Sequence, residues 1–412
     1  MKFGASTRQK ERGRYGGKRL LRQYVDIRGE IEKAGQNNQI IARIRPDPVY
    51  LVLFLILLTV GTVMSFSAGS AYAASQYGDS YYFLRRQLLF ITAGAVVALM
   101  LVIYGNPGNM RWVACGAYLA SILLLVLVLF KGQTGGGAQR WISIGSISVQ
   151  PSEIAKTGIV MFLAFYMSAR EDEIRSRGFN KKSTVCGVVI PALIIGAVAF
   201  LVALEHHFSG LIIILAIGAV MMFFGGTRII WFASGVPVAG IIAAIIMNTD
   251  YARSRIESWQ NRGADALGSD WQSTQGLYAI GTGGLFGLGL GQSRLKYGYV
   301  SQPQNDFVFT IVCEELGFFG AVAIMLLFVA LTARGFVLAA HAPDRFSSLV
   351  ILGLSFKLAL QVLLNIGVVS GVLPNTGISL PYFSTGGSAV IMQIIEAGII
   401  LCLSRFCTQK RT

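Results

Sequence analysis

VYLVLFLILLTVGTVMSF, residues 49–66, is a long run of apolar residues without a single charge. About 20 apolar residues, each rising 1.5 Å along a helix, cross the hydrocarbon core of a bilayer. Because lipid offers no hydrogen bonds, such a segment must satisfy its backbone groups internally, and a helix does so within one segment. The run therefore predicts a membrane-spanning helix.

Similar runs recur along the chain and predict an all-α, polytopic bundle of ten transmembrane helices. Only 13% of the 412 residues are charged, and 54% are hydrophobic, whereas soluble domains carry about 25% charged residues. The chain is therefore an integral membrane protein. The expected spans are Val49–Phe66, Leu88–Tyr104, Val113–Phe130, Ile154–Met167, Val185–Ala203, Leu211–Phe224, Ile229–Met247, Phe307–Leu331, Leu349–Val369 and Ala389–Leu403.

The distribution of lysine and arginine predicts the orientation. Cytoplasmic loops of membrane proteins carry an excess of both residues, and most of the 35 present fall inside if both termini are cytoplasmic. The net charge of +15 then reflects topology and anionic headgroups rather than nucleic acid. We expect a basic cytoplasmic tail at 1–47, a membrane domain at 48–405 and a cytoplasmic C-terminal tail at 406–412.

The segment 248–306 is predicted to be a large loop on the extracytoplasmic face. Its apolar stretches, Leu277–Ile280 and Leu285–Leu290, suggest short helices at the membrane surface. Its glycine clusters at 281–284 and 287–291 imitate a phosphate-binding loop, but that motif requires a strand before it and a helix after it. We interpret these glycines as tight turns or points of close backbone packing.

Five motifs resemble the FtsW/RodA/SpoVE (SEDS) family of bacterial glycan polymerases in order and spacing. The likeness covers roughly residues 48–405, and the segment 77–87 is more similar to the division or sporulation branch than to the elongation branch. The motifs are GAQRWI at 137–142, QPSEIAK at 150–156, NDFVF at 305–309, EELG at 314–317 and LPYFSTGGS at 380–388.

The resemblance implies a peptidoglycan glycosyltransferase of the bacterial inner membrane with its active site on the outer face. It would polymerise glycan strands from lipid II by inverting transfer, with undecaprenyl pyrophosphate as the leaving group. Family members act with a class B penicillin-binding protein, a single-pass transpeptidase, and with other divisome proteins. Ser301 and Gln302 depart from the family pattern, as does His206-His207, where many members have Pro-Asp.

Asp306 is the candidate catalytic residue. The resemblance places the family's essential aspartate here, where the long loop re-enters the bilayer. A carboxylate whose pKa is raised by partial burial can take the proton of an attacking sugar hydroxyl. The alternative is an N-cap, because Asn and Asp before an apolar run often begin a helix. One residue can serve both purposes.

The remaining candidates would bind substrate. The leaving pyrophosphate needs positive charge, although snorkelling at a helix end explains any single cation equally well. A divalent cation, Mg²⁺ or Mn²⁺, could share this task, but no dedicated metal-ligand cluster is visible. The candidates, some of them from the resemblance, are Arg140, Trp141, Lys156, Arg253, Arg255, Lys296, Glu315, Ser384, Gly386 and Gly387.

Charges inside the membrane are expensive and usually functional. Glu314 and Glu315 lie about two turns into the eighth span, so we expect Lys156 to pair with one of them. Lys357 and Glu396 either face a cavity or pair with each other. His206 and His207 are expected to be interfacial polar residues rather than ligands.

Two other functions fit ten spans with internal charges. One is a transporter, including a flippase for lipid II, although no internal repeat of the kind common in transporters is visible. The other is a non-catalytic divisome scaffold. A partner helix is expected to dock on the eighth and ninth spans, where Gly320 and Gly353 would permit close approach.

Overall fold

The computed structural model describes residues 45–135, 138–144, 147–176, 181–261, 270–300 and 302–407. Most of the expected basic tail, the loop residues 262–269 and the last five residues lie outside these ranges. The elements are α2 (Pro48–Tyr77), α3 (Tyr82–Tyr104), α4 (Pro107–Lys131), β1 (Gln133–Gly135), β2 (Ala138–Ile144), β3 (Ile147–Val149), α5 (Pro151–Ala169), α6 (Glu171–Ile174), α7 (Lys181–Thr184), η2 (Val185–Val189), α8 (Ile190–Leu204), α9 (Phe208–Gly225), α10 (Ile230–Met247), α11 (Asp250–Gln260), α12 (Trp271–Thr282), α13 (Val308–Ala340), α14 (Arg345–Val369) and α15 (Gly387–Ser404).

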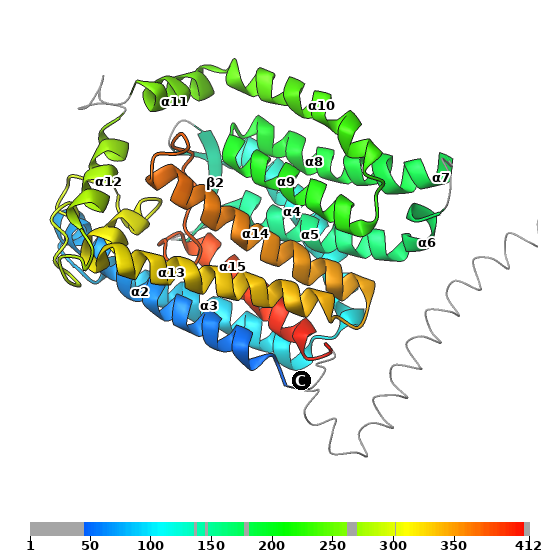
Figure 1. Cartoon of the computed structure of the whole chain (residues 1–412), viewed down its shortest axis with the longest axis horizontal. Coiled ribbons are helices and arrows are strands. Elements are labelled where there is room, and N and C mark those ends of the chain that lie inside the picture. Colours follow the sequence, from blue (N-terminus) through cyan, green and yellow to red (C-terminus); the bar gives the residue numbers. More distant parts are fainter. Residues whose placement is uncertain are drawn as a thin grey trace, which may run out of the picture.

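Helices dominate the architecture, as the hydropathy predicts (Figure 1). A helix lies at each of the ten expected spans. Among the described residues, eight helices are long and apolar enough to cross a membrane by length and composition. The exact number of crossings stays a prediction. The largest difference from the expected spans is at α2, which continues to Tyr77. Its helical hydrogen bonding extends through small and aromatic residues after the apolar run ends.

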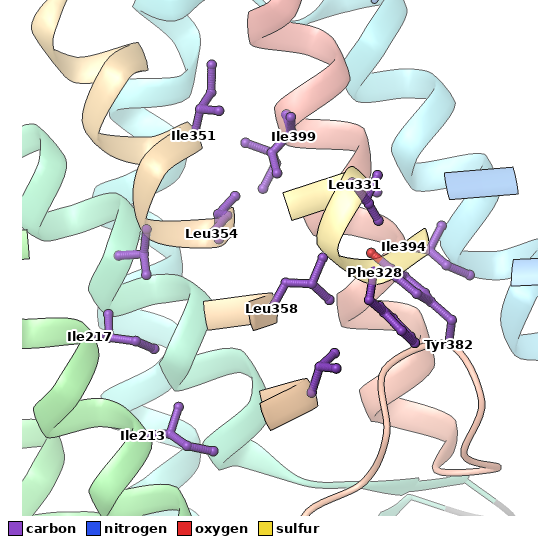
Figure 2. Close-up of a cluster of buried hydrophobic side chains, with 14 of the residues drawn as sticks. Ile213, Ile217, Phe328, Leu331, Ile351, Leu354, Leu358, Tyr382, Ile394 and Ile399 are labelled. Carbon is purple, nitrogen blue, oxygen red and sulfur yellow. The ribbon is translucent and has the colours of Figure 1, made fainter. Parts of the chain in front are cut away.

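The helices form a bundle in which neighbours in space are often distant in sequence. α15 packs on α3, α13 packs on α2 and α14, and α5 packs on α4, α9 and α14. α10 lies at the edge of the bundle and is followed directly by α11 (Figure 1). Large buried side chains fill the interior between α9, α13, α14 and α15 (Figure 2).

The segment around Tyr382 enters this apolar interior. The Tyr382 ring packs edge-on against Phe54 and parallel to Phe328, with ring centroids 5.4 Å and 6.4 Å away. Figure 2 shows Tyr382 beside Phe328. Gly61 of α2 faces this turn, and a Cβ there would lie 2.4 Å from the Tyr382 carbonyl oxygen. Glycine is therefore required at this crossing.

A small antiparallel sheet, β1-β2-β3, follows α4 and was not expected from the sequence. Ile142 pairs with Val149 and Ile144 with Ile147. β-branched side chains favour such pairing. Together with α11, α12 and the segment 371–386, this sheet marks one end of the bundle (Figure 1), which we call the site end.

The glycine-rich segment after α12 packs closely through its backbone, as predicted, and its partner is the first part of α13. The N–H groups of Leu288 and Gly289 donate to the carbonyls of Glu314 and Glu315, both at 3.0 Å. α13 is kinked at Gly317, whose φ of 68° is open to glycine. A Cβ at Gly287 would lie 2.2 Å from the Glu315 carbonyl oxygen. Of the expected surface helices, only the stretch in α12 forms; Leu285–Leu290 lies in turns.

The predicted docking surface on the eighth and ninth spans is wrong at Gly353. This glycine lies inside the bundle, where a Cβ would be 2.6 Å from the Met221 Sδ and from a Val160 methyl group. It permits close packing of α14 on α5 and α9. Gly320, on α13, is half-buried.

Candidate functional site

Asp306 lies in the turn immediately before α13, at the site end. The N-cap of α13 is Phe307, and no side chain caps the helix. The N-cap explanation of Asp306 is therefore wrong, because the helix begins one residue too late for it. The Asn365 side chain of α14 donates to the carbonyls of Asp306 and Ile378 at 2.9 and 2.7 Å. Asn365 thus ties this turn to the segment after α14.

The Asp306 carboxylate is partly exposed and makes no hydrogen bond or ion pair with the residues that the structure describes. Desolvation by surrounding protein raises its pKa above the usual value, while the positive charges of Arg255 and Arg140 oppose that rise. A carboxylate in this state is a stronger base than a solvated one. Its environment suits it to accept a proton.

Arg140 and Trp141 lie on β2, which carries them to the site end. Successive side chains of a strand point to opposite faces, so the two residues face different neighbours. The Arg140 guanidinium donates to the His206 carbonyl at 3.3 Å. Trp141, half-buried, pairs with Gln133 of β1. The sheet therefore connects Arg140 to the turn between α8 and α9.

Arg255 and Arg253 lie on α11. Arg255 donates to the Asn375 carbonyl at 2.8 Å and contributes the larger of the two favourable charges acting on Asp306. Arg253, two residues earlier on the helix, is exposed and has no such effect. Of the cations predicted from the sequence, the structure brings Arg140 and Arg255 near Asp306.

The segment 380–387 binds the two residues that precede Asp306. The backbone N–H and hydroxyl of Thr385 donate to the Gln304 carbonyl and the Asn305 side chain, at 3.0 and 2.9 Å. The hydroxyl of Ser384, buried, accepts from the Leu380 N–H at 2.9 Å.

Gly386 caps α15 and Gly387 begins it. A Cβ at Gly387 would lie 2.6 Å from the Phe90 ring. These predicted binding residues therefore shape the site through backbone and packing.

The predicted pairing of Lys156 with Glu314 or Glu315 is wrong. Lys156 pairs with Glu153, one turn earlier on α5, at 2.6 Å. The pairing of Lys357 with Glu396 is confirmed, and Thr157 also donates to that glutamate. Residues three apart on a helix are neighbours. Glu153 is therefore within reach of Lys156 whatever the depth of the other helices in the membrane.

Lys296 and Glu315 form a third buried pair, 3.1 Å apart. The Ser67 hydroxyl also donates to Glu315, and the Ser293 hydroxyl donates to Glu314, at 2.5 Å. These contacts hold the glycine-rich segment on α13 and α2. They act on the fold, and neither Lys296 nor Glu315 contributes to the electrostatics of Asp306.

Sequence reasoning missed Glu205, the residue that ends α8. It is almost fully buried, and neither of its carboxylate oxygens has a partner among the described residues. Burial raises its pKa to about 8, opposed by the charge of Arg140. A single glutamate at a helix end looks like an ordinary interfacial residue, so the sequence carried no distinguishing signal.

His206 and His207 differ sharply. His206 is exposed, as expected, and has a φ of 55°, which proline cannot adopt. His207 is buried, contrary to expectation, and its Nδ1 has no partner in the described part of the chain. Burial, with Arg140 and Lys156, lowers its pKa to about 3, so the ring is neutral. This turn therefore differs from one with the sequence Pro-Asp in the backbone conformation of residue 206 and in the charge of residue 207.

The described residues include no group of three or more His, Cys, Asp or Glu side chains that could hold a metal ion. A divalent cation that shares the task of the arginines stays a prediction.

Known proteins resemble this chain in sequence and in fold. A family model that covers FtsW, RodA and SpoVE, described as "Cell cycle protein", matches residues 48–409. The chain is 39% identical over 370 residues to stage V sporulation protein E of Bacillus subtilis, spanning 88% of this chain and 97% of that protein. It is 34% identical over 363 residues to the probable peptidoglycan glycosyltransferase FtsW of Trichlorobacter lovleyi, spanning 87% and 93%.

Two solved structures share the fold. A chain from work on the structural coordination of polymerization and crosslinking by a peptidoglycan synthase complex superposes with a TM-score of 0.70 at 28% identity, covering 89% of this chain and 99% of that one. The rod shape determining protein RodA of Thermus thermophilus superposes with a TM-score of 0.64 at 27% identity, covering 89% and 98%.

Proposed function

We propose a function on the premise that this chain belongs to the FtsW/RodA/SpoVE family. The chain is a peptidoglycan glycosyltransferase of a bacterial membrane, the activity after which several of its relatives are named. The observation that carries this function is the Asp306 carboxylate, partly exposed, with a raised pKa and flanked by the charges of Arg255 and Arg140.

The substrate we propose is lipid II. A lipid-linked sugar presents its reacting centre where headgroups meet hydrocarbon. Asp306 lies two residues before an apolar helix begins, which supports a position at that depth. A soluble sugar nucleotide would instead call for a dedicated nucleotide fold.

The chemical step is a single displacement. Asp306 accepts the proton of the attacking sugar hydroxyl, and the hydroxyl oxygen forms a bond to the anomeric carbon of the donor. The bond from that carbon to the pyrophosphate oxygen breaks, and its electron pair leaves with undecaprenyl pyrophosphate. One displacement inverts the anomeric configuration. Placement of the base contributes about 10²- to 10⁴-fold to such a step.

Arg140 and Arg255 are the cations that support the leaving pyrophosphate. Both act electrostatically at Asp306, so a phosphate group beside the reacting carbon would feel the same charges. Among the described residues, no group of three or more His, Cys, Asp or Glu side chains could hold a metal ion. A divalent cation that shares this task would therefore be held mainly by the pyrophosphate itself.

The site end faces the outside of the cell in this proposal, with both termini in the cytoplasm. The charge distribution along the sequence supports this orientation. A class B penicillin-binding protein is the proposed partner, because one structural relative comes from a peptidoglycan synthase complex. Other divisome proteins are further proposed partners, which the family description "Cell cycle protein" supports.

The test is polymerisation of lipid II by the purified full chain in proteoliposomes, with and without a class B penicillin-binding protein. We expect glycan strands, resolved by gel electrophoresis, and release of undecaprenyl pyrophosphate. A parallel assay follows transfer of fluorescent lipid II between leaflets. Leaflet transfer without polymer would identify a flippase, and neither activity under both conditions would favour a scaffold.

A further inference from the structure

A cavity of about 360 Å³ lies at the site end between α11, α12 and the segment that follows α14. Its size is at the small end of the range for ligand pockets, roughly 300–1,000 Å³. That volume suits a sugar ring or a disaccharide. None of the sequence-predicted residues except Arg255 lines it.

The walls of this cavity are held in place before any ligand binds. The Trp259 indole N–H donates to the Gly371 carbonyl at 3.0 Å, and Arg255 donates to the Asn375 carbonyl at 2.8 Å. The Ser258 hydroxyl donates to Asp270, which joins α11 to the start of α12. Two helices and one loop are thus tied together around the space. Such preorganisation lowers the entropy cost of binding.

The lining matches a neutral carbohydrate. Ser254, Ser273 and Gln272 supply hydroxyl and amide groups that both donate and accept hydrogen bonds. Trp259 supplies a half-exposed aromatic ring, an apolar surface with a polar edge. Pyranose rings have the complementary pattern of hydroxyl groups at the rim and C–H groups on the face.

The charged residues on the lining favour a neutral ligand. Arg255 and Asp270 carry opposite charges on the cavity wall, so the lining has no excess of positive charge. On the Asp306 side, by contrast, Arg255 acts together with a second cation, Arg140.

The cavity adjoins the candidate base through one residue and one loop. Arg255 both lines the cavity and acts on the charge of Asp306. Asn375, another lining residue, accepts from the Gly377 N–H at 3.2 Å. Gly377 lies next to Asp306, because a Cβ added to this glycine would be 3.4 Å from the Asp306 Oδ2. A glycan that reacts at Asp306 therefore passes beside this cavity.

We propose that the cavity is a carbohydrate subsite that binds a sugar ring of the glycan next to the reacting unit, with Trp259 as its stacking surface. This inference rests on the proposed function. The subsite holds the strand while undecaprenyl pyrophosphate leaves, so that the same strand is extended again. Its loss shortens the product more than it slows the first bond.

The test combines two measurements on the purified full chain. Binding of a lipid-free GlcNAc–MurNAc tetrasaccharide is measured by saturation-transfer NMR, and product length is measured in lipid II polymerisation. The variants are Trp259→Ala, which removes the ring, and Ser273→Leu, which fills the cavity but keeps the Trp259–Gly371 hydrogen bond. Trp112→Ala, at a highly exposed residue of α4, is the matched control.

We expect both cavity variants to weaken tetrasaccharide binding about 5- to 10-fold, the scale of one aromatic contact, and to yield shorter strands. The control should match the wild type. If wild-type protein polymerises lipid II but does not bind the tetrasaccharide, or if both variants behave as the control, the subsite is disproved and the activity stands. If wild-type protein forms no polymer but binds the tetrasaccharide, the proposed function fails and the cavity remains a carbohydrate site.

Discussion

Two groups of charged side chains in this molecule differ in how they are paired. Within the bundle, Lys156, Lys296 and Lys357 each contact a glutamate, and all three lysines are almost completely buried. At the site end, the carboxylates of Asp306 and Glu205 make no hydrogen bond or ion pair with any described residue. Charge therefore serves different purposes in the two regions.

The difference has a physical reason. A buried charge costs several kcal/mol unless a partner offsets the lost hydration, so the interior pairs are conditions of folding. A carboxylate without a partner costs stability and keeps its reactivity, a combination that is typical of functional sites. The paired groups therefore serve the architecture, whereas an unpaired carboxylate such as Asp306 is available for chemistry. Each of the following predictions tests one side of this distinction.

The largest expected effect concerns an interior pair. Lys357→Met leaves Glu396 buried without its cation, which should lower the free energy of unfolding by about 3–5 kcal/mol. The double variant Lys357→Met/Glu396→Leu should recover most of this loss, because both charges are then gone. Thermal unfolding in detergent measures both, with the exposed residue Lys131→Met as a control. A stable single variant would show that the pair is not structural.

Asp306→Asn should abolish most activity without affecting the fold. The amide keeps the shape but cannot accept the proton, so the rate of lipid II polymerisation should fall on the order of 100-fold or more. Lipid II binding and the melting temperature should be retained. Asp79→Asn, a matched change in the ion pair with Arg85, should leave the rate unchanged. Near-normal turnover by the Asp306 variant would remove it from the mechanism.

Arg255→Gln should move the pH dependence of polymerisation. Activity rises with pH as Asp306 loses its proton, and Arg255 opposes the rise in the pKa of Asp306 caused by burial. Removal of this charge should shift the acidic limb of kcat to higher pH. Arg253→Gln, on the same helix but exposed, is the control. An unchanged limb in both variants would mean that Asp306 does not titrate in the rate-determining step.

Glu205→Gln should have the smallest effect, on stability at alkaline pH. The glutamate titrates near 4.5 when unfolded and near 8 when folded. Between these values the folded protein holds a proton that the unfolded chain lacks, so stability falls as pH rises towards 8. The variant removes this loss and should gain on the order of 1 kcal/mol relative to wild type between pH 7 and pH 9. His207 contributes little to the pH dependence of stability in this range, because its pKa is about 3 in the folded protein and 6.5 in the unfolded chain. If the melting temperatures of both proteins change with pH in the same way, the raised pKa of Glu205 is wrong.

Part of the candidate site was predictable. The position of Asp306 before an apolar run and the basic residues Arg140 and Arg255 are visible in the sequence, and the structure brings these three together. Glu205 was not predictable, because its lack of partners depends on neighbours from other helices. The sheet at 133–149 was missed because its strands are only three to seven residues long.

The long apolar helices of this protein follow from hydropathy alone, because the bilayer demands internally paired backbone over about 20 apolar residues. The partners of its charges do not. Ser67 reaches Glu315 and Thr157 reaches Glu396 across more than 200 residues of chain, so packing of distant helices sets each pair. Lys156 instead pairs with Glu153, one turn away on the same helix. Local sequence patterns specify which residues become helical. The free-energy cost of burying a charge is offset only when the helices assemble and each charged side chain meets its partner.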